Sequence, residues 1–297
     1  MSDGTFMATF VIVFRETLEA ALIVGIILTV LARLGAMRYG PHVWASSALA
    51  VAVSILVGWV LSVTTQSIQG QWEKIIEGVI SLLACGVLTY MVFWMDRQGK
   101  RIKPEVETRV EGAVSRSELA VIVTLPFLAV LREGAETVLF LKAVAFQSSG
   151  AVSLVGGLLG GVLAIGVTAA IFIGGRKIPL RALFRSTGLL LLFIAAGLLA
   201  YGVHELQELG WIPTLVYPVW NINFLLNETE GLGAFLKALF GYNGNPSLLE
   251  VIVYVSYLLG IGIALRRLRQ PTHTPPSPMP PEPSPARQPK APEPVAV

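Results

Sequence analysis

The chain has 297 residues, of which 54% are hydrophobic and only 14% are charged. A water-soluble globule of this size needs more polar surface, so the composition favours a membrane protein. The formal net charge is +3, and the basic residues flank apolar runs without interleaved aromatic side chains, which argues against a nucleic-acid partner. Cys85 is the only cysteine, so the chain has no internal disulfide or thiolate cluster.

Seven apolar runs are each long enough to cross the hydrocarbon core as a helix, which takes about 20 residues. The first lacks a preceding basic residue and is too long for a cleaved signal peptide, so we expect it to remain as a span. We therefore predict an all-α integral membrane protein with seven transmembrane helices, surrounded by lipid in the cell (inner or plasma) membrane. The runs begin near Phe6, Val43, Ile75, Leu119, Ala151, Ser186 and Leu248.

Basic residues concentrate in alternate loops, and this asymmetry predicts the orientation of the chain. The loops after the first, third, fifth and seventh runs are rich in Arg and Lys, whereas the opposite loops hold only Lys74, Lys142 and Lys237. Because basic loops stay on the cytoplasmic side, we expect the N-terminus outside and the C-terminus inside.

An internal repeat is the strongest sign of organisation. Residues 14–20 read Phe-Arg-Glu-Thr-Leu-Glu-Ala, and residues 131–137 read Leu-Arg-Glu-Gly-Ala-Glu-Thr. The same charged pattern thus opens two successive sets of three runs, and because three is odd the second set enters the membrane from the opposite face. This predicts a 3+3 inverted repeat of the kind found in many transporters, plus one extra helix.

The predicted domains follow from this repeat. A seven-helix transmembrane domain spans residues 1–270, with repeat one at about 6–96, repeat two at about 118–204 and the seventh helix at about 248–265. Residues 271–297 are dominated by Pro and should form a disordered cytoplasmic tail. Two overlapping Gly-x-x-x-Gly patterns in the fifth run favour close helix packing, either inside one protomer or in a homo-oligomer; they comprise Gly156, Gly157, Gly160 and Gly161.

The two motifs carry the candidate chemistry. In a helix, residues three and four apart share a face, so the charged side chains of each motif point the same way. A charged side chain at the centre of a span costs about 2.5–3.5 kcal/mol, so all six groups should face the bundle interior. Four glutamates against two arginines leave two surplus negative charges, which suits a cation that prefers oxygen ligands. The candidate ligands are Glu16, Glu19, Glu133 and Glu136, supported by Arg15 and Arg132.

A second group of polar residues lies at the outer ends of the third and sixth runs. Each set falls on one helical face and could collect cations before the central site, although solvated interfacial glutamates are equally common. These entry candidates are Glu73, Glu77, His204, Glu205 and Glu208. Met91 and Met95 in the third run are interpreted as packing residues.

Two membrane-embedded Arg-Glu-x-x-Glu motifs, in the first and fourth of seven runs, resemble the oxidase-dependent iron permeases, which include the fungal high-affinity permeases and bacterial EfeU-type permeases. The resemblance covers about residues 6–265. It implies that the four glutamates bind and pass iron, supplied as ferric iron by an extracytoplasmic ferroxidase or iron-delivery protein, with no permanent cofactor. It also implies a transporter and not an enzyme.

Two other functions stay open on the residues alone. Oxygen ligands suit Mn²⁺ or Mg²⁺ as well as iron, so the chain could be a permease for another hard divalent cation. A membrane di-iron carboxylate enzyme is less favoured, because such centres use Glu-x-x-His pairs and neither motif has the histidine.

Overall fold

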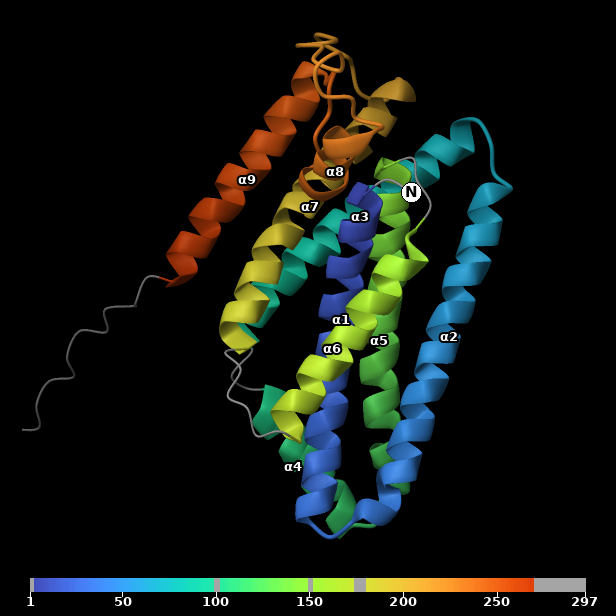
Figure 1. The fold of residues 1–297 in the computed structure, drawn as a ribbon, viewed down its shortest axis with the longest axis vertical. Coiled ribbons are helices and arrows are strands. Elements are labelled where there is room, and N and C mark those ends of the chain that lie inside the picture. Colours follow the sequence, from blue (N-terminus) through green and yellow to red (C-terminus); the bar gives the residue numbers. More distant parts are fainter. Residues whose placement is uncertain (1–2, 99–101, 149–151, 174–179, 270–297) are drawn as a thin grey trace, which may run out of the picture.

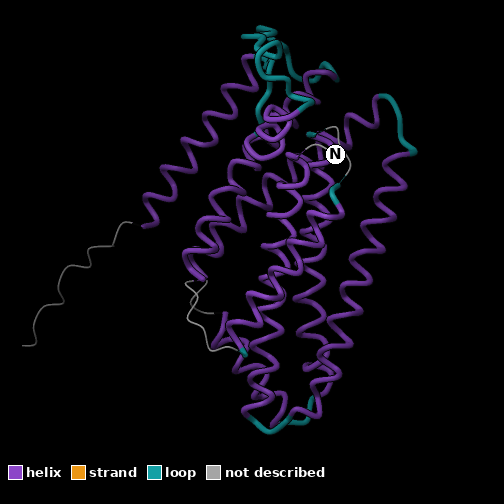
Figure 2. The backbone as a smooth tube through the Cα atoms, in the orientation of Figure 1, coloured by secondary structure: helices purple, strands orange, loops and turns teal. Residues whose placement is uncertain are grey.

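The computed structural model describes residues 3–98, 102–148, 152–173 and 180–269. These residues form nine α-helices and one short 3-10 helix, η1 (Met37–Tyr39), and the described part contains no strand (Figure 2). The α-helices are α1 (Asp3–Arg33), α2 (Gly40–Gln66), α3 (Gln71–Gln98), α4 (Ile102–Ser115), α5 (Leu119–Gln147), α6 (Leu154–Phe172), α7 (Leu180–Glu208), α8 (Gly231–Phe240) and α9 (Leu248–Arg269). The predicted Pro-rich tail, 271–297, lies outside the described residues.

The long helices alternate in direction along the chain (Figure 1). α1 begins at the end of the bundle that carries α8, here named the α8 end, and finishes at the opposite end beside α4, here named the α4 end. α5 runs in the reverse direction to α1, so the two motif-bearing helices are antiparallel. The short helix α4 falls within the charged segment 96–117, where the sequence predicts an interfacial helix or an ordered loop.

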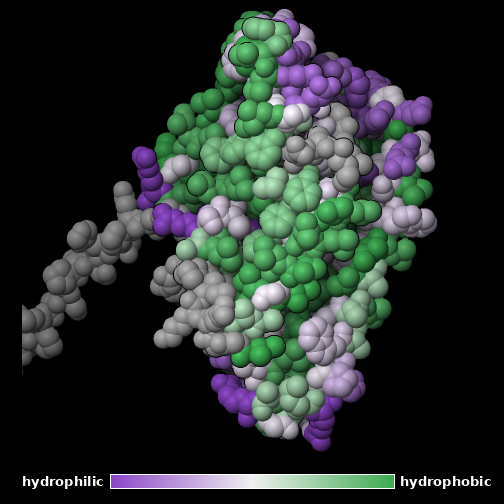
Figure 3. Space-filling model, viewed as in Figure 1, coloured by the Kyte–Doolittle hydropathy of each residue, from purple (hydrophilic) through white to green (hydrophobic). Residues whose placement is uncertain are grey.

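Five helices are long and apolar enough to cross a membrane by length and composition: 37–66, 71–95, 154–172, 182–208 and 248–267. The two remaining long helices, α1 with 31 residues and α5 with 29, carry the charged motifs in their middle. These charges lower the mean hydropathy of α1 and α5 and keep them out of the group of five. The five apolar helices support a multi-pass membrane protein, while the count of seven spans remains a prediction. Figure 3 shows hydrophobic side chains across the middle of one face and hydrophilic ones toward its ends.

Close packing holds α1 against α6, and the glycines of α6 make it possible. A Cβ atom at Gly156 would lie 2.6 Å from the carbonyl oxygen of Phe6, and one at Gly160 would lie 2.6 Å from that of Phe10. The Gly-x-x-x-Gly pattern is therefore used inside this chain, where it lets the two backbones approach. α2 packs against α5 and α3 against α7 in the other main helix contacts.

The segment between α7 and α9 contains the short helix α8, which packs against the long helices. Its helix α8 packs against α1 and α7, with Ala234, Ala238 and Leu239 buried. Gly4 of α1 allows this approach, because a side chain there would collide with the backbone of Ala234. Small residues on both helices thus let one face of α8 pack closely against α1.

Candidate metal centre

The contact between α1 and α5 brings the two Arg-Glu-x-x-Glu motifs together. Carboxylate oxygens of Glu16, Glu19 and Glu133 all lie within 4.8 Å of one another. The three residues are buried, with 1%, 8% and 4% of their surfaces exposed. The fourth motif glutamate, Glu136, has a side chain 14% exposed. Three acidic groups this close, away from water, form a candidate cation site.

Arg15 lies beside this carboxylate group and is only 1% exposed. Its Nη1 is 3.4 Å from Oε1 of Glu16, and its Nη2 is 3.1 Å from Oε1 of Glu19. The guanidinium therefore neutralises part of the negative charge on α1.

Arg132 occupies a different environment from its counterpart. Its Nε donates a hydrogen bond to Oε1 of Glu136 at 2.9 Å and lies 3.7 Å from Oε1 of Glu133. However, 44% of its side chain is exposed, and its guanidinium carbon lies 5.1 Å from the ring centre of Trp94. The expectation that all six charged groups point into the interior is therefore met by five of them.

The carboxylates are not fully matched by the arginines. Buried oxygens without a hydrogen-bond donor include Oε2 of Glu16, Glu133 and Glu136. Oε1 of Glu19 also lacks one, because the Nη2 of Arg15 is close to it without aligned hydrogen-bond geometry. Each motif glutamate thus keeps an oxygen that can accept a cation, and leaving such oxygens bare in a buried site is costly.

Apolar layers separate the carboxylates from both ends of the bundle. Toward the α8 end, buried side chains from α1, α3, α5 and α7 form one cluster, which includes Ile12, Leu88, Phe140 and Leu191. Toward the α4 end, a second cluster joins α1, α2, α4 and α5 and includes Ile27, Leu31, Val110, Ile122 and Val130. These layers keep water from screening the charges, which strengthens their interaction with a bound cation.

Sequence reasoning missed two contacts of the site. Met91 and Met95 of α3 place their sulfur atoms 3.5 Å from Nη1 and 3.2 Å from Nη2 of Arg15. Their spacing of four residues puts them on one helical face, which was the available signal. It could not identify α1 as the helix that this face meets.

The entry candidates gather at the α8 end, where α3 and α7 cross closely enough that a Cβ atom at Gly78 would touch Glu205. The Tyr201 hydroxyl donates to Oε2 of Glu77 at 2.5 Å, and Glu205 is buried. Glu73 is exposed one turn before Glu77. The structure thus brings Glu77 and Glu205 to the same helix crossing.

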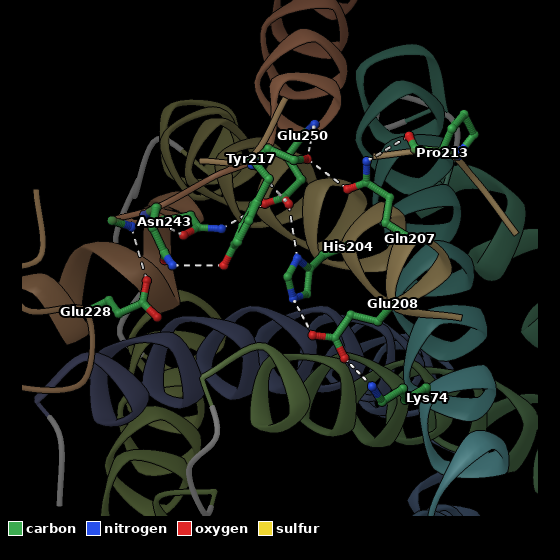
Figure 4. A network of polar contacts seen from close by, with 12 residues as sticks. Lys74, His204, Gln207, Glu208, Pro213, Tyr217, Glu228, Asn243 and Glu250 are labelled. Atoms are coloured by element: carbon green, nitrogen blue, oxygen red, sulfur yellow. Dashed lines mark hydrogen bonds and ion pairs between the residues drawn. The ribbon is translucent and has the colours of Figure 1, made fainter. Parts of the chain in front are cut away.

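His204 and Glu208 belong to a chain of ion pairs in the same region. His204 lies between Glu250 of α9 at 3.0 Å and Glu208 at 3.3 Å, and Glu208 also pairs with Lys74 (Figure 4). These two residues are therefore occupied by protein partners. An adjacent cavity of about 300 Å³ is lined by polar residues, among them Tyr201, His204, Glu205, Glu228, Lys237 and Glu250.

A helical bundle with apolar spans and a buried, partly unmatched carboxylate cluster defines a membrane transporter for cations. Comparison with known proteins specifies the family: residues 6–267 match the model described as the iron permease FTR1 family. The chain belongs to this family. Because it is a family of permeases, the prediction of a transporter and not an enzyme is confirmed.

Curated relatives agree over most of the chain. The ferrous iron permease EfeU of Yersinia pestis is 36% identical over 252 residues, which cover 84% of this chain and 89% of that relative. The proteins of the same name from Yersinia pseudotuberculosis and Escherichia coli O6:H1 are 36% and 33% identical over 252 residues, covering 88% and 91% of their own lengths. Both alignments cover 84% of this chain. No solved structure matches the chain.

Proposed function

We propose that this chain carries iron across the cell membrane into the cytoplasm, and that Glu16, Glu19, Glu133 and Glu136 form the site through which the ion passes. The observation that supports this most directly is the group of three carboxylates within 4.8 Å. Unmatched carboxylate oxygens in that group need a positive partner, which the two motif arginines supply only in part.

The charge of the site favours Fe²⁺ as the ion that occupies it. Four glutamates and two arginines leave a surplus of two negative charges when all are ionised, and a divalent ion balances this surplus. The relatives are named as ferrous iron permeases. Delivery of ferric iron by an extracytoplasmic oxidase, which the family resemblance implies, remains a prediction and would require reduction of the ion before or at the site.

Seven spans arranged as an inverted repeat fit this role. Exchanging α1 with α5, α2 with α6 and α3 with α7 converts the α1–α6 contact into the α5–α2 contact, and both are extensive. The third motif position supports the same exchange. Thr17 of α1 lies toward Gly161 of α6, and Gly134 of α5 lies against Ser54 of α2. Equivalent positions of the two motifs thus face equivalent helices, as an inverted repeat requires.

The acidic crossing at the α8 end is the proposed entry. With the N-terminus outside, Glu77 and Glu205 face the outer side, and Glu73 lies at its surface. At the α4 end, Arg33 at the end of α1, Arg38 in η1 and Arg116 after α4 supply positive charge, which supports placing that end in the cytoplasm.

Uptake of radiolabelled iron by cells that express the chain tests this function. Glu16→Gln and Glu133→Gln keep the side-chain shape and remove the charge, so each should reduce iron uptake at least tenfold while the protein stays folded. Glu105→Gln is the matched control, because Glu105 on α4 is 56% exposed and forms an ion pair with Arg109 of the same helix, away from both motifs. Gel-filtration profile and melting temperature in detergent report folding.

The same assay, carried out with different metal ions, separates an iron permease from a permease for another divalent cation. Iron should be offered as Fe²⁺ with ascorbate and as Fe³⁺ with citrate, beside Mn²⁺ and Mg²⁺. Preferred uptake of Mn²⁺ or Mg²⁺ would favour a permease for another divalent cation, which all-oxygen ligands also suit. Parental iron uptake by folded Glu16→Gln and Glu133→Gln would refute the central site.

A further inference from the structure

One face of α3 contacts both motif arginines. Met91 and Met95 contact the guanidinium of Arg15, and Trp94, between them in sequence, lies under the guanidinium of Arg132. Residues three and four apart share a helical face, so a single turn of α3 meets both halves of the proposed repeat.

All three side chains are weak, polarisable partners for a cation. A thioether sulfur is a weak hydrogen-bond acceptor, and an indole ring attracts a guanidinium through its π face. Neither competes with an ionised carboxylate, whose hydrogen bonds to arginine are about twice as strong as neutral ones. Each arginine is therefore shared between strong carboxylate partners and weak partners on α3.

The weak partners matter because Arg15 is almost completely buried. Its Nε has no hydrogen-bond partner, and its two Nη atoms are divided between the carboxylates and the sulfurs. If the sulfurs were replaced by hydrocarbon, the Nη groups would keep only Glu16 and Glu19 as partners. Arginine would then hold the carboxylates more tightly, at the expense of an incoming cation.

We propose that Met91, Trp94 and Met95 are positioning residues that hold the motif arginines beside the glutamates without locking the two together. The arginines then neutralise part of the charge of the empty site, and an arriving cation takes over the carboxylates while the guanidiniums keep their contacts with α3. This inference rests on the proposed function, because it assumes that the four glutamates bind the transported ion. It assigns to α3 a role that belongs to neither motif.

The test compares Met91→Leu/Met95→Leu with the parent, with Met7→Leu as the matched control. Leucine keeps nearly the same volume and removes the acceptor, and Met7 packs against the same apolar cluster away from the arginines. Two quantities are measured: Fe²⁺ binding to the purified protein in detergent, with a reductant that keeps the iron ferrous, and the KM of iron uptake by cells. The double variant should bind roughly 3- to 10-fold more weakly with Vmax little changed, as expected for losing two weak hydrogen bonds.

A cycle with Arg15→Gln distinguishes positioning from packing. In that background the methionine changes should no longer alter Fe²⁺ binding, because the group that they position is gone. An equal loss of binding in both backgrounds, or a double variant that binds within twofold of Met7→Leu, would overturn the proposal. Binding by purified protein keeps this comparison readable even where Arg15→Gln abolishes transport.

Substitutions of Trp94 test the contact with Arg132 independently of the methionines. Trp94→Phe retains an aromatic face for Arg132 and should restore most of the binding that Trp94→Leu loses, whereas equal loss in both would contradict the role given to the ring. Failure of the proposed function itself looks different. In that case the parent does not bind Fe²⁺, or Glu16→Gln binds it as the parent does.

Discussion

Replacing Gly160 by alanine is expected to force α1 and α6 apart. The added Cβ would lie 2.6 Å from the carbonyl oxygen of Phe10 and 3.0 Å from the amide nitrogen of Phe14. Ordinary contact begins near 3.4 Å, so the helices must separate by 3.4 − 2.6, about 0.8 Å. Both neighbours are backbone atoms, which cannot rotate away as a side chain can. Overpacking of this kind costs about 1–3 kcal/mol.

The same displacement should reach the metal centre, because Glu16 and Glu19 follow Phe14 on α1. Binding sites tolerate shifts of only about 0.5 Å, so iron uptake should fall together with stability. Gly166→Ala is the control: it lies in the same helix, and a Cβ there meets nothing within 4 Å. That change should leave stability unchanged or raise it by up to about 1 kcal/mol through helix propensity.

Melting temperature in detergent and initial rates of iron uptake measure both effects. Gly160→Ala should melt several degrees below Gly166→Ala and take up iron more slowly. Equal melting temperatures for the two variants would refute the argument that backbone contact between α1 and α6 limits the space at Gly160. A lower melting temperature with parental uptake would refute only the link to the site.

Two further predictions concern the α8 end. Lys74→Met removes one of the two ion-pair partners of Glu208, and because the Lys74 and Glu208 side chains are about 40% exposed the melting temperature should hardly change. Iron uptake measured at low salt should instead gain apparent affinity from the added negative charge, and this gain should vanish at high ionic strength; a salt-independent gain would contradict the electrostatic reason. Glu250→Gln weakens the buried bonds that a 3% exposed carboxylate accepts from His204 and Asn243, so the melting temperature should fall by an amount equivalent to about 1–3 kcal/mol, and an unchanged value would show that the network adds nothing to stability.

Several features of this protein were readable from particular residues. The charged motifs predicted two interior-facing sets of carboxylates, because six charges in apolar runs cannot face lipid without a large penalty. The spacing of Glu16 from Glu19 and of Glu133 from Glu136 placed each pair on one helical face. In the structure Arg15 approaches both members of the first pair, and Arg132 both members of the second. The mixed charges of segment 96–117 predicted a short interfacial helix or an ordered loop instead of a span, and the structure has the helix α4 there.

Other features needed the tertiary structure. Helical periodicity gives the face of Met91 and Met95 but not the helix that this face meets, so their contact with Arg15 could not be read from the sequence. The glycines of α6 fitted contacts inside or between protomers, and only the position of α1 shows that Gly156 and Gly160 make contacts inside the chain. The two nearly identical motifs also gave no sign that Arg15 would be buried and Arg132 exposed.

The sequence by itself determined the helical membrane architecture and the family, and it predicted the carboxylates of the candidate site, because hydropathy, charge and motif spacing act locally along the chain. The tertiary structure alone decided which helices meet, and hence which carboxylate oxygens remain without a donor and which side chains hold the arginines. Those properties depend on contacts between residues that are distant in sequence, such as Arg15 and Met95, and such contacts are set by how whole helices pack.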